Sequence, residues 1–271
     1  MTDRYAVVGN PIAQTKSPRI HAAFARQTGE DLVYDAILAP LDGFGAAVAA
    51  FRAAGGRGLN VTVPFKLEAF ALATERSERA QEAGAVNTLR FDGDRALGDN
   101  TDGAGLVSDI TLRLRVPLAG KRVLLMGAGG AARGVVGPLL RERPATLAIA
   151  NRTVEKAHQL VRTFAPQGPV HGGGYSEVAG EAFDVVINAT SASLAGAVPP
   201  LPEGVFAPGA LAYDLVYGDR PTSFLVSARA SGAASVADGL GMLVAQAAES
   251  FQLWRGVRPD TAPVIEALRA Q

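Results

Sequence analysis

Residues 126–133, Met126-Gly127-Ala128-Gly129-Gly130-Ala131-Ala132-Arg133, close an apolar run that begins at Arg122 and open a stretch typical of a helix. The pattern predicts a strand, a glycine turn and a helix. In that arrangement the free amides of a helix N-terminus hold a dinucleotide diphosphate. Gly127 permits the tight turn, Gly129 lets phosphate approach the backbone, and Ala132 packs helix on strand. The stretch therefore predicts a Rossmann-type domain.

The end of the next strand indicates which dinucleotide is bound. Thr146–Ala150 is typical of a strand, and Asn151, Arg152 and Thr153 follow it. Binders of NAD usually place an Asp or Glu there to hold the ribose hydroxyls. The forked guanidinium of Arg152 and the hydroxyl of Thr153 suit the 2′-phosphate of NADP instead. We predict NADP in preference to NAD; the alternative is that Arg152 is an ordinary surface arginine.

Composition excludes several classes of protein. The chain has 271 residues, enough for two domains, and 48% of them are hydrophobic. Its formal net charge is zero, so nucleic acid is not an expected partner. It has no cysteine, which excludes disulfides, thiol nucleophiles and cysteine-ligated zinc. No metal is expected. The polar start and short apolar runs predict a cytoplasmic protein with no membrane partner.

Strand-like and helical runs alternate along the chain, which predicts an α/β fold with a parallel or mostly parallel sheet in the N-terminal part. A further helix is expected around residues 103–114. Two Gly/Pro-rich segments, Gln167–Gly174 and Pro199–Gly209, are expected to be loops. The predicted strands are Tyr5–Gly9, Leu32–Leu38, Gly58–Val63, Asn87–Phe91, Thr146–Ala150, Asp184–Asn188 and Leu211–Leu215, and the predicted N-terminal helices are Pro18–Gln27, Gly43–Ala54 and Lys66–Leu72.

An amphipathic helix is expected near the C-terminus. Its apolar positions recur at spacings of three and four: Leu240, Leu243, Ala247, Phe251 and Trp254. The helix either caps the second domain or returns to the first. We expect the return, with residues 1–102 and 239–271 forming a substrate domain and residues 103–238 the NADP domain. Ligands favour the cleft between such domains.

Hydroxyl groups lie at the start of the first predicted helix. Thr15 and Ser17 precede Pro18, which is favoured in the first helical turn. One interpretation is that Ser17 is only an N-cap. The other is a hydroxyl pair beside a helix N-terminus, suited to a carboxylate.

Polar residues also gather at the ends of other predicted elements. Asn60 and Thr62 share one side of a period-two strand, and a buried amide needs hydrogen-bond partners. Lys66 follows this strand; at a helix start it could simply be solvated. Asp102 precedes Gly103 and could merely cap the next helix.

Together these segments resemble the shikimate dehydrogenases over nearly the whole chain, in order. The motifs that carry the resemblance are Gly9–Ile12, Lys16–Pro18, Asn60–Lys66, Gly84–Thr88, Asp99–Gly103, Gly127–Arg133, Asn151–Thr153, Asn188–Ser191, Tyr213–Tyr217, Gly241–Leu243 and Gln246-Ala247. One departure is that many members have His-Ser where this chain has Gln14-Thr15, which adds a methyl group at the pocket edge.

The resemblance implies an oxidoreductase of aromatic amino-acid biosynthesis that reversibly reduces 3-dehydroshikimate to shikimate with NADPH. It implies that Lys66 and Asp102 are the catalytic pair. The implied substrate residues are Thr15, Ser17, Asn60, Thr62, Asn87, Tyr217 and Gln246. The implied cofactor residues are Gly127, Ala128, Gly129, Gly130, Ala131, Asn151, Arg152, Thr153, Thr190, Ser191, Gly239 and Met242, with Met242 near the nicotinamide.

The chemistry supports the same pair from the residues themselves. Hydride delivery to a ketone builds negative charge on oxygen, which a protonated group must balance. Cysteine is absent, and His21, His158 and His171 stand in no motif linked to the predicted site. A lysine beside a carboxylate can polarise a carbonyl and pass on a proton.

Two other functions fit parts of the pattern. One is a quinate/shikimate dehydrogenase with dual or NAD preference, for which an acidic residue is expected near Arg152. The other is a catalytically silent nucleotide sensor, which would have no evident need for Lys66, Asp102, Asn60 and Asn87. We expect a monomer or a homodimer.

Overall fold

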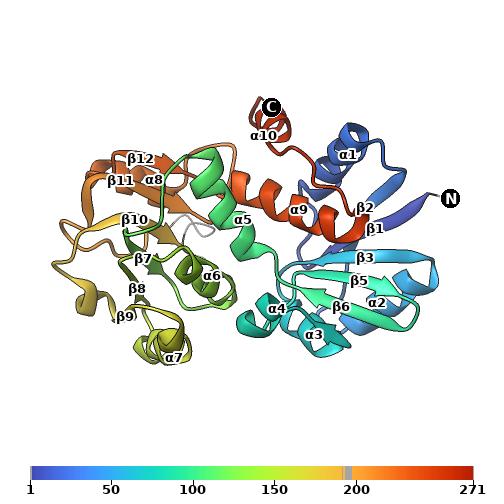
Figure 1. The fold of residues 1–271 in the computed structure, drawn as a ribbon, viewed down its shortest axis with the longest axis horizontal. Helices are drawn as coiled ribbons and strands as arrows, with labels where there is room; N and C mark the ends of the chain where they lie inside the picture. Colours follow the sequence, from blue (N-terminus) through green and yellow to red (C-terminus); the bar gives the residue numbers. More distant parts are fainter. Residues whose placement is uncertain (1, 191, 193–196, 271) are drawn as a thin grey trace. The chain divides into compact units, whose positions relative to one another are not determined.

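The computed structural model describes residues 2–190, 192 and 197–270. The chain divides into two compact units. Unit 1 comprises Met1–Gly105 and Val244–Gln271, and unit 2 comprises Leu106–Leu243. Each unit contains its own six-stranded sheet (Figure 1). The protein is therefore α/β with two separate sheets.

Unit 1 is built around a mixed sheet with the strand order β2-β1-β3-β5-β6-β4. β1 pairs in parallel with β2 and β3, and β4 with β6, whereas β5 is antiparallel to both β3 and β6. Parallel pairing therefore predominates, as predicted. The elements are β1 (Asp3–Gly9), α1 (Ser17–Thr28), β2 (Leu32–Leu38), α2 (Phe44–Ala53), β3 (Gly56–Val61), α3 (Lys66–Leu72), β4 (Glu75–Arg76), α4 (Glu78–Ala83), β5 (Thr88–Asp92), β6 (Arg95–Asp99) and α10 (Ala262–Arg269), together with α5 (Asp102–Ser108) and α9 (Leu240–Arg255), each of which crosses the boundary between the two units.

Alternate residues of β1 pack into two apolar layers of unit 1, because successive strand side chains point to opposite faces. Ala6 and Val8 join a core formed with side chains of α2 and α3. On the other face Tyr5 stacks on Trp254 of α9, with ring centroids 4.6 Å apart. Trp254 also donates a hydrogen bond to the carbonyl of Leu89 at 3.0 Å. The C-terminal helix thus returns to the first sheet (Figure 1).

Unit 2 has an all-parallel sheet with the order β12-β11-β10-β7-β8-β9. Counted from β7, this is the strand order 3-2-1-4-5-6 of the Rossmann fold. The order reverses between β7 and β10, which is where such folds bind ligands. The elements are the π-helix Asp109–Arg113, β7 (Arg122–Met126), α6 (Gly130–Arg141), β8 (Thr146–Ala150), α7 (Val154–Phe164), β9 (Val170–Gly173), β10 (Phe183–Asn188), β11 (Phe206–Asp214), α8 (Ser223–Ala230) and β12 (Ser235–Ala237), with short 3-10 turns at Ala165–Gln167 and Tyr175–Val178.

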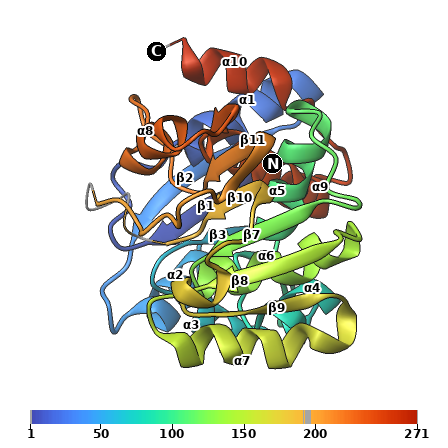
Figure 2. The same ribbon diagram turned by 90° about the vertical axis from the view of Figure 1, so that its left-hand side faces the viewer.

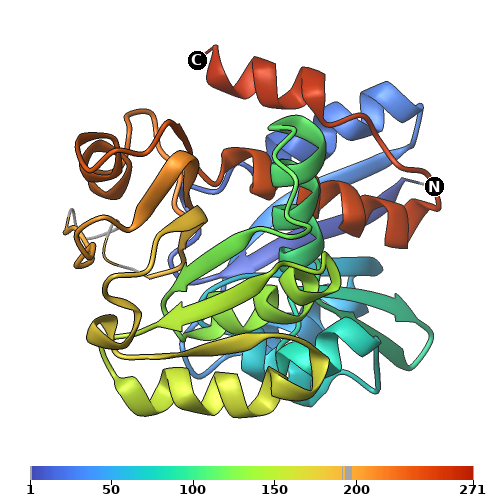
Figure 3. The ribbon, with the colours of Figure 1, turned by 60° about the vertical axis from the view of Figure 1, so that its left-hand side comes forward.

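Helices cover both faces of this second sheet. Val123 and Leu125 of β7 join one apolar cluster with side chains of α6 and α7, while Leu124 and Met126 join another with side chains of α8. α8 contacts β11 and β12 (Figure 2), and α7 runs beside β9 (Figure 3). Both faces of each central strand are therefore buried, as in other parallel sheets.

Four sequence expectations differ from the structure. The expected loop Gln167–Gly174 contains β9. The glycines of this segment are typical of a loop, but Gly172 is needed in the strand because a Cβ there would overlap the carbonyl of Ile149. The expected loop Pro199–Gly209 already contains the start of β11 at Phe206. The expected helix 103–114 is α-helical only to Ser108 and then widens to a π-helix.

The fourth difference concerns the strand predicted over Gly58–Val63. It ends at Val61, where the pairing of β3 with β1 ends as well. Thr62 therefore lies just beyond the strand and not on its face with Asn60. Within residues 2–190, 192 and 197–270, no helix combines the length and apolar character needed to cross a bilayer.

Candidate active site

Lys66 and Asp102 form an ion pair in unit 1. Lys66 is the first residue of α3 and Asp102 is the first residue of α5. The ammonium Nζ of Lys66 lies 2.5 Å from Oδ2 of Asp102, with 23% of the lysine side chain exposed and 5% of the aspartate. The carboxylate is thus buried while part of the lysine stays open to a ligand. This is the pair predicted from the sequence.

Asn87 engages the other oxygen of the Asp102 carboxylate. Its Nδ2 donates to Oδ1 of Asp102 at 2.8 Å, and its Oδ1 accepts from the backbone N–H of Thr101 at 2.9 Å. Because that N–H can only donate, it fixes which end of the amide faces Asp102. Both carboxylate oxygens are therefore held by side chains, so Asp102 does more than cap a helix.

Asn60 joins the same hydrogen-bonded network from β3. Its Nδ2 donates to Oγ of Ser250 at 2.9 Å and to Oγ1 of Thr88 at 3.1 Å, and its Oδ1 accepts from the hydroxyl of Tyr34 at 2.7 Å. Thr88 and Ser250 lie 2.8 Å apart, and the Thr88 hydroxyl also donates to Oδ1 of Asn87 at 2.9 Å. One network thus links Asn60 to the Lys66–Asp102 ion pair.

His21 lies under this network without joining it by a hydrogen bond. It is fully buried, and its ring stacks on Tyr34 with centroids 4.1 Å apart. Neither ring nitrogen has a hydrogen-bond partner among the residues described. Burial lowers the pKa of His21 to about 3, so the ring is neutral near pH 7. His21 therefore packs in the core of unit 1.

Thr15 and Ser17 meet at the start of α1. The hydroxyl of Thr15 donates to Oγ of Ser17 at 3.1 Å, and the N–H of Ser17 donates back to Oγ1 of Thr15 at 3.3 Å. The N-cap residue is Lys16, so the interpretation of Ser17 as the cap is wrong. Two neighbouring hydroxyls at a helix N-terminus suit a carboxylate ligand.

The remaining predicted substrate residues fall into both units. Gln246 of α9 accepts from Nδ2 of Asn87 at 3.5 Å and so belongs to the network of unit 1. Thr62 follows β3 and lies against Gly9, where a Cβ would overlap the Thr62 methyl. Tyr217 follows β11 in unit 2, and burial raises the pKa of its hydroxyl.

The glycine turn of unit 2 lies at the reversal of strand order. Gly127 follows β7 with a φ of 114°, and a Cβ there would lie 3.0 Å from the carbonyl of Ala189. Only glycine suits both conditions. Gly129 is the N-cap of α6 and Gly130 its first residue, and open space lies where their Cβ atoms would be. Ala128 and Ala131 flank them. This space beside free helical amides fits a dinucleotide diphosphate.

Asn151, Arg152 and Thr153 connect β8 to α7. Nδ2 of Asn151 donates to the carbonyl of Thr153 at 2.8 Å, which folds the segment into a tight turn. Arg152 is exposed, and no salt bridge involves it within the described part of the chain. Its guanidinium is thus available to a phosphate, with no carboxylate competing for it.

Three more predicted cofactor residues lie at other strand and helix ends. Thr190 follows β10, and its hydroxyl donates to Oδ1 of Asn188 at 2.7 Å. Gly239 precedes α9, and Met242 is 8% exposed in the first turn of that helix. Ser191 lies outside the described residues.

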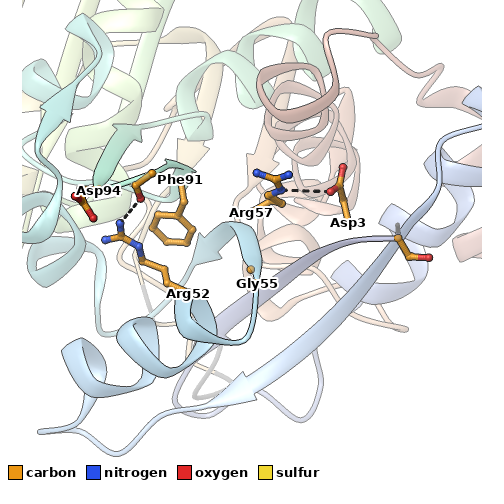
Figure 4. A pocket seen from close by; sticks show the side chains of 9 residues that line it. Asp3, Arg52, Gly55, Arg57, Phe91 and Asp94 are labelled. Atoms are coloured by element: carbon orange, nitrogen blue, oxygen red, sulfur yellow. Dashed lines mark hydrogen bonds and ion pairs between the residues drawn. The ribbon is translucent and has the colours of Figure 1, made fainter.

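A pocket of about 550 Å³ occupies the opposite end of the unit 1 sheet (Figure 4). Three of its charged groups already have partners: Nε of Arg57 lies 3.3 Å from Oδ1 of Asp3, and Arg52 donates to the carbonyl of Gly93 at 2.8 Å. None of the predicted site residues lines it. No cluster of three or more His, Asp or Glu side chains able to hold a metal occurs among the residues described.

Comparisons with known proteins agree with this geometry. Residues 7–89 match the family description "Shikimate dehydrogenase substrate binding domain", residues 111–195 match "Shikimate / quinate 5-dehydrogenase", and residues 239–269 match "Shikimate 5'-dehydrogenase C-terminal domain". The shikimate dehydrogenase (NADP(+)) of Dechloromonas aromatica is 64% identical over 271 residues, which cover 100% of this chain and 99% of the relative. The chain belongs to the shikimate dehydrogenase family.

Solved structures support the family assignment. An Ael1 enzyme from Pseudomonas putida has a TM-score of 0.92 and 51% identity, with 98% of each chain covered. The shikimate 5-dehydrogenase of Thermus thermophilus, solved in complex with NADP(H) and shikimate, has a TM-score of 0.85 and 36% identity, with 99% of each chain covered. The two-domain architecture with a Rossmann-type sheet is therefore confirmed.

Sequence reasoning overlooked part of the hydrogen-bonded network around the Lys66–Asp102 ion pair. Thr88 and Thr101 lie inside quoted motifs, and their places beside Asn87 and Asp102 could have singled them out. Tyr34 and Ser250 carry no such signal, because their partners lie 26 and 190 residues away in the chain.

Proposed function

We propose that this chain catalyses the reversible reduction of 3-dehydroshikimate to shikimate with NADPH. One observation carries the proposal: the Lys66 ammonium and the buried Asp102 carboxylate are 2.5 Å apart in a chain of this family. The curated relative from Dechloromonas aromatica, named shikimate dehydrogenase (NADP(+)), supports the substrate and the cofactor.

Lys66 acts as the proton donor in the proposed reaction. When bound, NADPH supplies a hydride to the carbonyl carbon of the ring ketone. Negative charge then develops on the ketone oxygen, and Lys66 balances it and transfers one proton to that oxygen. In the reverse direction the neutral amine accepts the proton of the alcohol. Asp102 orients the ammonium, and Asn87 holds the carboxylate in place for that task.

The proposed substrate residues divide by the chemistry of the ligand. Thr15 and Ser17 bind the substrate carboxylate beside the N-terminus of α1. The amides and hydroxyls bind the ring oxygens; these residues are Asn60, Thr62, Asn87, Tyr217 and Gln246. Because a neutral phenol can donate a hydrogen bond, the raised pKa of Tyr217 fits this role.

The proposed cofactor residues are those of unit 2 that the sequence singles out. The turn Gly127–Ala131 holds the diphosphate, Asn151–Thr153 hold the 2′-phosphate end, and Met242 lies near the nicotinamide. The further proposed cofactor residues are Thr190, Ser191 and Gly239. We accordingly propose residues 1–102 and 239–271 as the substrate domain and 103–238 as the NADP domain. We also propose that the protein is a monomer or a homodimer and that it is cytoplasmic.

Rates with each combination of shikimate or quinate and NADP⁺ or NAD⁺ test the function. Appearance of nicotinamide absorbance with shikimate and NADP⁺, far faster than with the other combinations, is the expected result. Equal rates with quinate and NAD⁺ would favour the dual-specificity alternative. Tight NADPH binding without oxidation of shikimate would favour a nucleotide sensor.

A further inference from the structure

Asp109 is a buried carboxylate of unit 2 that the proposed chemistry leaves unused. It is 2% exposed. Its Oδ2 accepts from the hydroxyl of Tyr213 at 2.6 Å and from Nη2 of Arg113 at 2.9 Å, while its Oδ1 accepts from Nε of Arg113. A buried ion pair rarely makes a protein more stable than apolar side chains of the same size would. The Asp109–Arg113 pair therefore suggests a role other than stability, such as positioning another part of unit 2.

The backbone widens at Asp109 to permit these contacts. α5 ends at Ser108, and the π-helix Asp109–Arg113 follows, with the N–H of Leu114 donating to the carbonyl of Asp109 at 3.0 Å. Short π-helical turns are rare and often lie at functional sites. This one directs a charged side chain into the interior of unit 2.

The segment Gly239–Met242 lies directly against this carboxylate. A Cβ on Gly241 would overlap the Asp109 carboxylate, and a Cβ on Gly239 would overlap the carbonyl of Leu215. Both glycines therefore allow a close approach that any larger residue would prevent.

The hydroxyl of Tyr213 holds the buried carboxylate that lies against Gly241. It donates to Oδ2 of Asp109 at 2.6 Å. Burial, followed by the charge of Asp109, raises the pKa of Tyr213, so the phenol keeps the proton that it donates. The Tyr213 hydroxyl thus fixes the carboxylate of the π-helix against which Gly241 packs.

We propose that Asp109 and Tyr213 are positioning residues for the nicotinamide end of the NADP site. They fix the backbone of Gly241 and Met242, so that Met242 faces the reactive ring in one conformation. The inference rests on the proposed function, which places Met242 beside the nicotinamide. Substitution of Asp109 or Tyr213 should therefore weaken binding of the nicotinamide half of NADPH and leave binding of the other half unchanged.

Binding of whole and truncated cofactor tests the inference. Tyr213→Phe removes the connecting hydroxyl and keeps the ring; Asp109→Asn keeps the shape and removes the charge. For both variants we expect the Kd of NADPH to rise about fivefold to tenfold, the size of one lost hydrogen bond. The Kd of 2′,5′-ADP, which lacks nicotinamide, should stay within about twofold of wild type.

Catalysis gives a second readout that a purely structural role would not change. Turnover of Tyr213→Phe should fall, and the isotope effect with NADPH deuterated at the transferred position should rise, because hydride transfer becomes more rate-limiting. The matched control is Tyr5→Phe, which removes a buried hydroxyl from unit 1, and it should leave both dissociation constants unchanged.

Equal losses of affinity for NADPH and 2′,5′-ADP, or no loss for either, would overturn the inference. Should Tyr213→Phe fail to fold, Gly241→Ala tests the same contact from the opposite side and should give the same split between the two ligands. These binding readouts need no shikimate. A wild-type protein that binds NADPH but does not oxidise shikimate therefore refutes the proposed function alone.

Discussion

Arg152 should determine the preference for NADPH over NADH. The side chain is exposed after β8, and no salt bridge occupies it among the residues described. A charge-assisted hydrogen bond to phosphate contributes about 1.5–3 kcal/mol, and about 1.4 kcal/mol corresponds to a tenfold change in Kd. Arg152→Ala should therefore weaken NADPH about 10- to 100-fold and leave NADH nearly unchanged.

Steady-state kinetics with both cofactors measure this effect. Because the site is exposed, added salt should reduce the NADPH preference of the wild type and have little effect on Arg152→Ala. Arg162→Ala is the matched control, since Arg162 lies in α7 of the same unit and already pairs with Glu155. It should leave both cofactors unaffected.

Two results would refute the reasoning about Arg152. Equal losses for NADPH and NADH would mean that Arg152 supports the fold of the turn and does not bind the 2′-phosphate. An unchanged preference for NADPH would mean that another group binds it.

Two further predictions concern the network of unit 1. Thr88→Val removes the hydroxyl that joins Asn60, Asn87 and Ser250 and should raise the KM for shikimate about threefold to tenfold. Thr88→Ser keeps the hydroxyl and should keep the wild-type KM. The reverse ranking in steady-state assays would show that the methyl group matters and the hydroxyl does not. His21 has its pKa lowered by burial to about 3 from 6.5, so the unfolded chain binds the proton more tightly, and stability is lost as pH falls below 6.5. At about pH 5 the loss amounts to about 2 kcal/mol, and denaturant titrations of His21→Phe should lack that part of the acid sensitivity; an unchanged pH slope would contradict it.

Local sequence patterns were sufficient for the main strands and for singling out Lys66 and Asp102, which the structure brings together as an ion pair. The strand, glycine turn and helix around Gly127 follow from steric rules that act over a few residues. Lys66 and Asp102 are the first residues of two helices, and the sequence shows both as charged residues that directly follow a predicted strand or loop. Resemblance to a family then brought these separate segments together.

Features that depend on distant partners could not be predicted. β9 pairs with β8 through glycines that by composition indicate a loop, and its strand conformation comes from the neighbouring strand. Asp109, where the π-helix begins, has a hydrogen-bond partner in Tyr213, which lies 104 residues further along the chain. The place of Ser250 beside Asn60 likewise follows only from the return of α9 to the first sheet.

Turnover of Lys66→Ala with shikimate and NADP⁺ tests the central claim most directly. Loss of the group that accepts the alcohol proton in this direction should lower kcat by about 10²- to 10⁴-fold, with far less change in substrate affinity, because general acid–base catalysis contributes that much. Lys156→Ala, which removes a lysine from α7, serves as the control and should remain active. A Lys66→Ala protein that retains more than about a tenth of wild-type turnover would contradict the account, because Lys66 could not then be the proton donor.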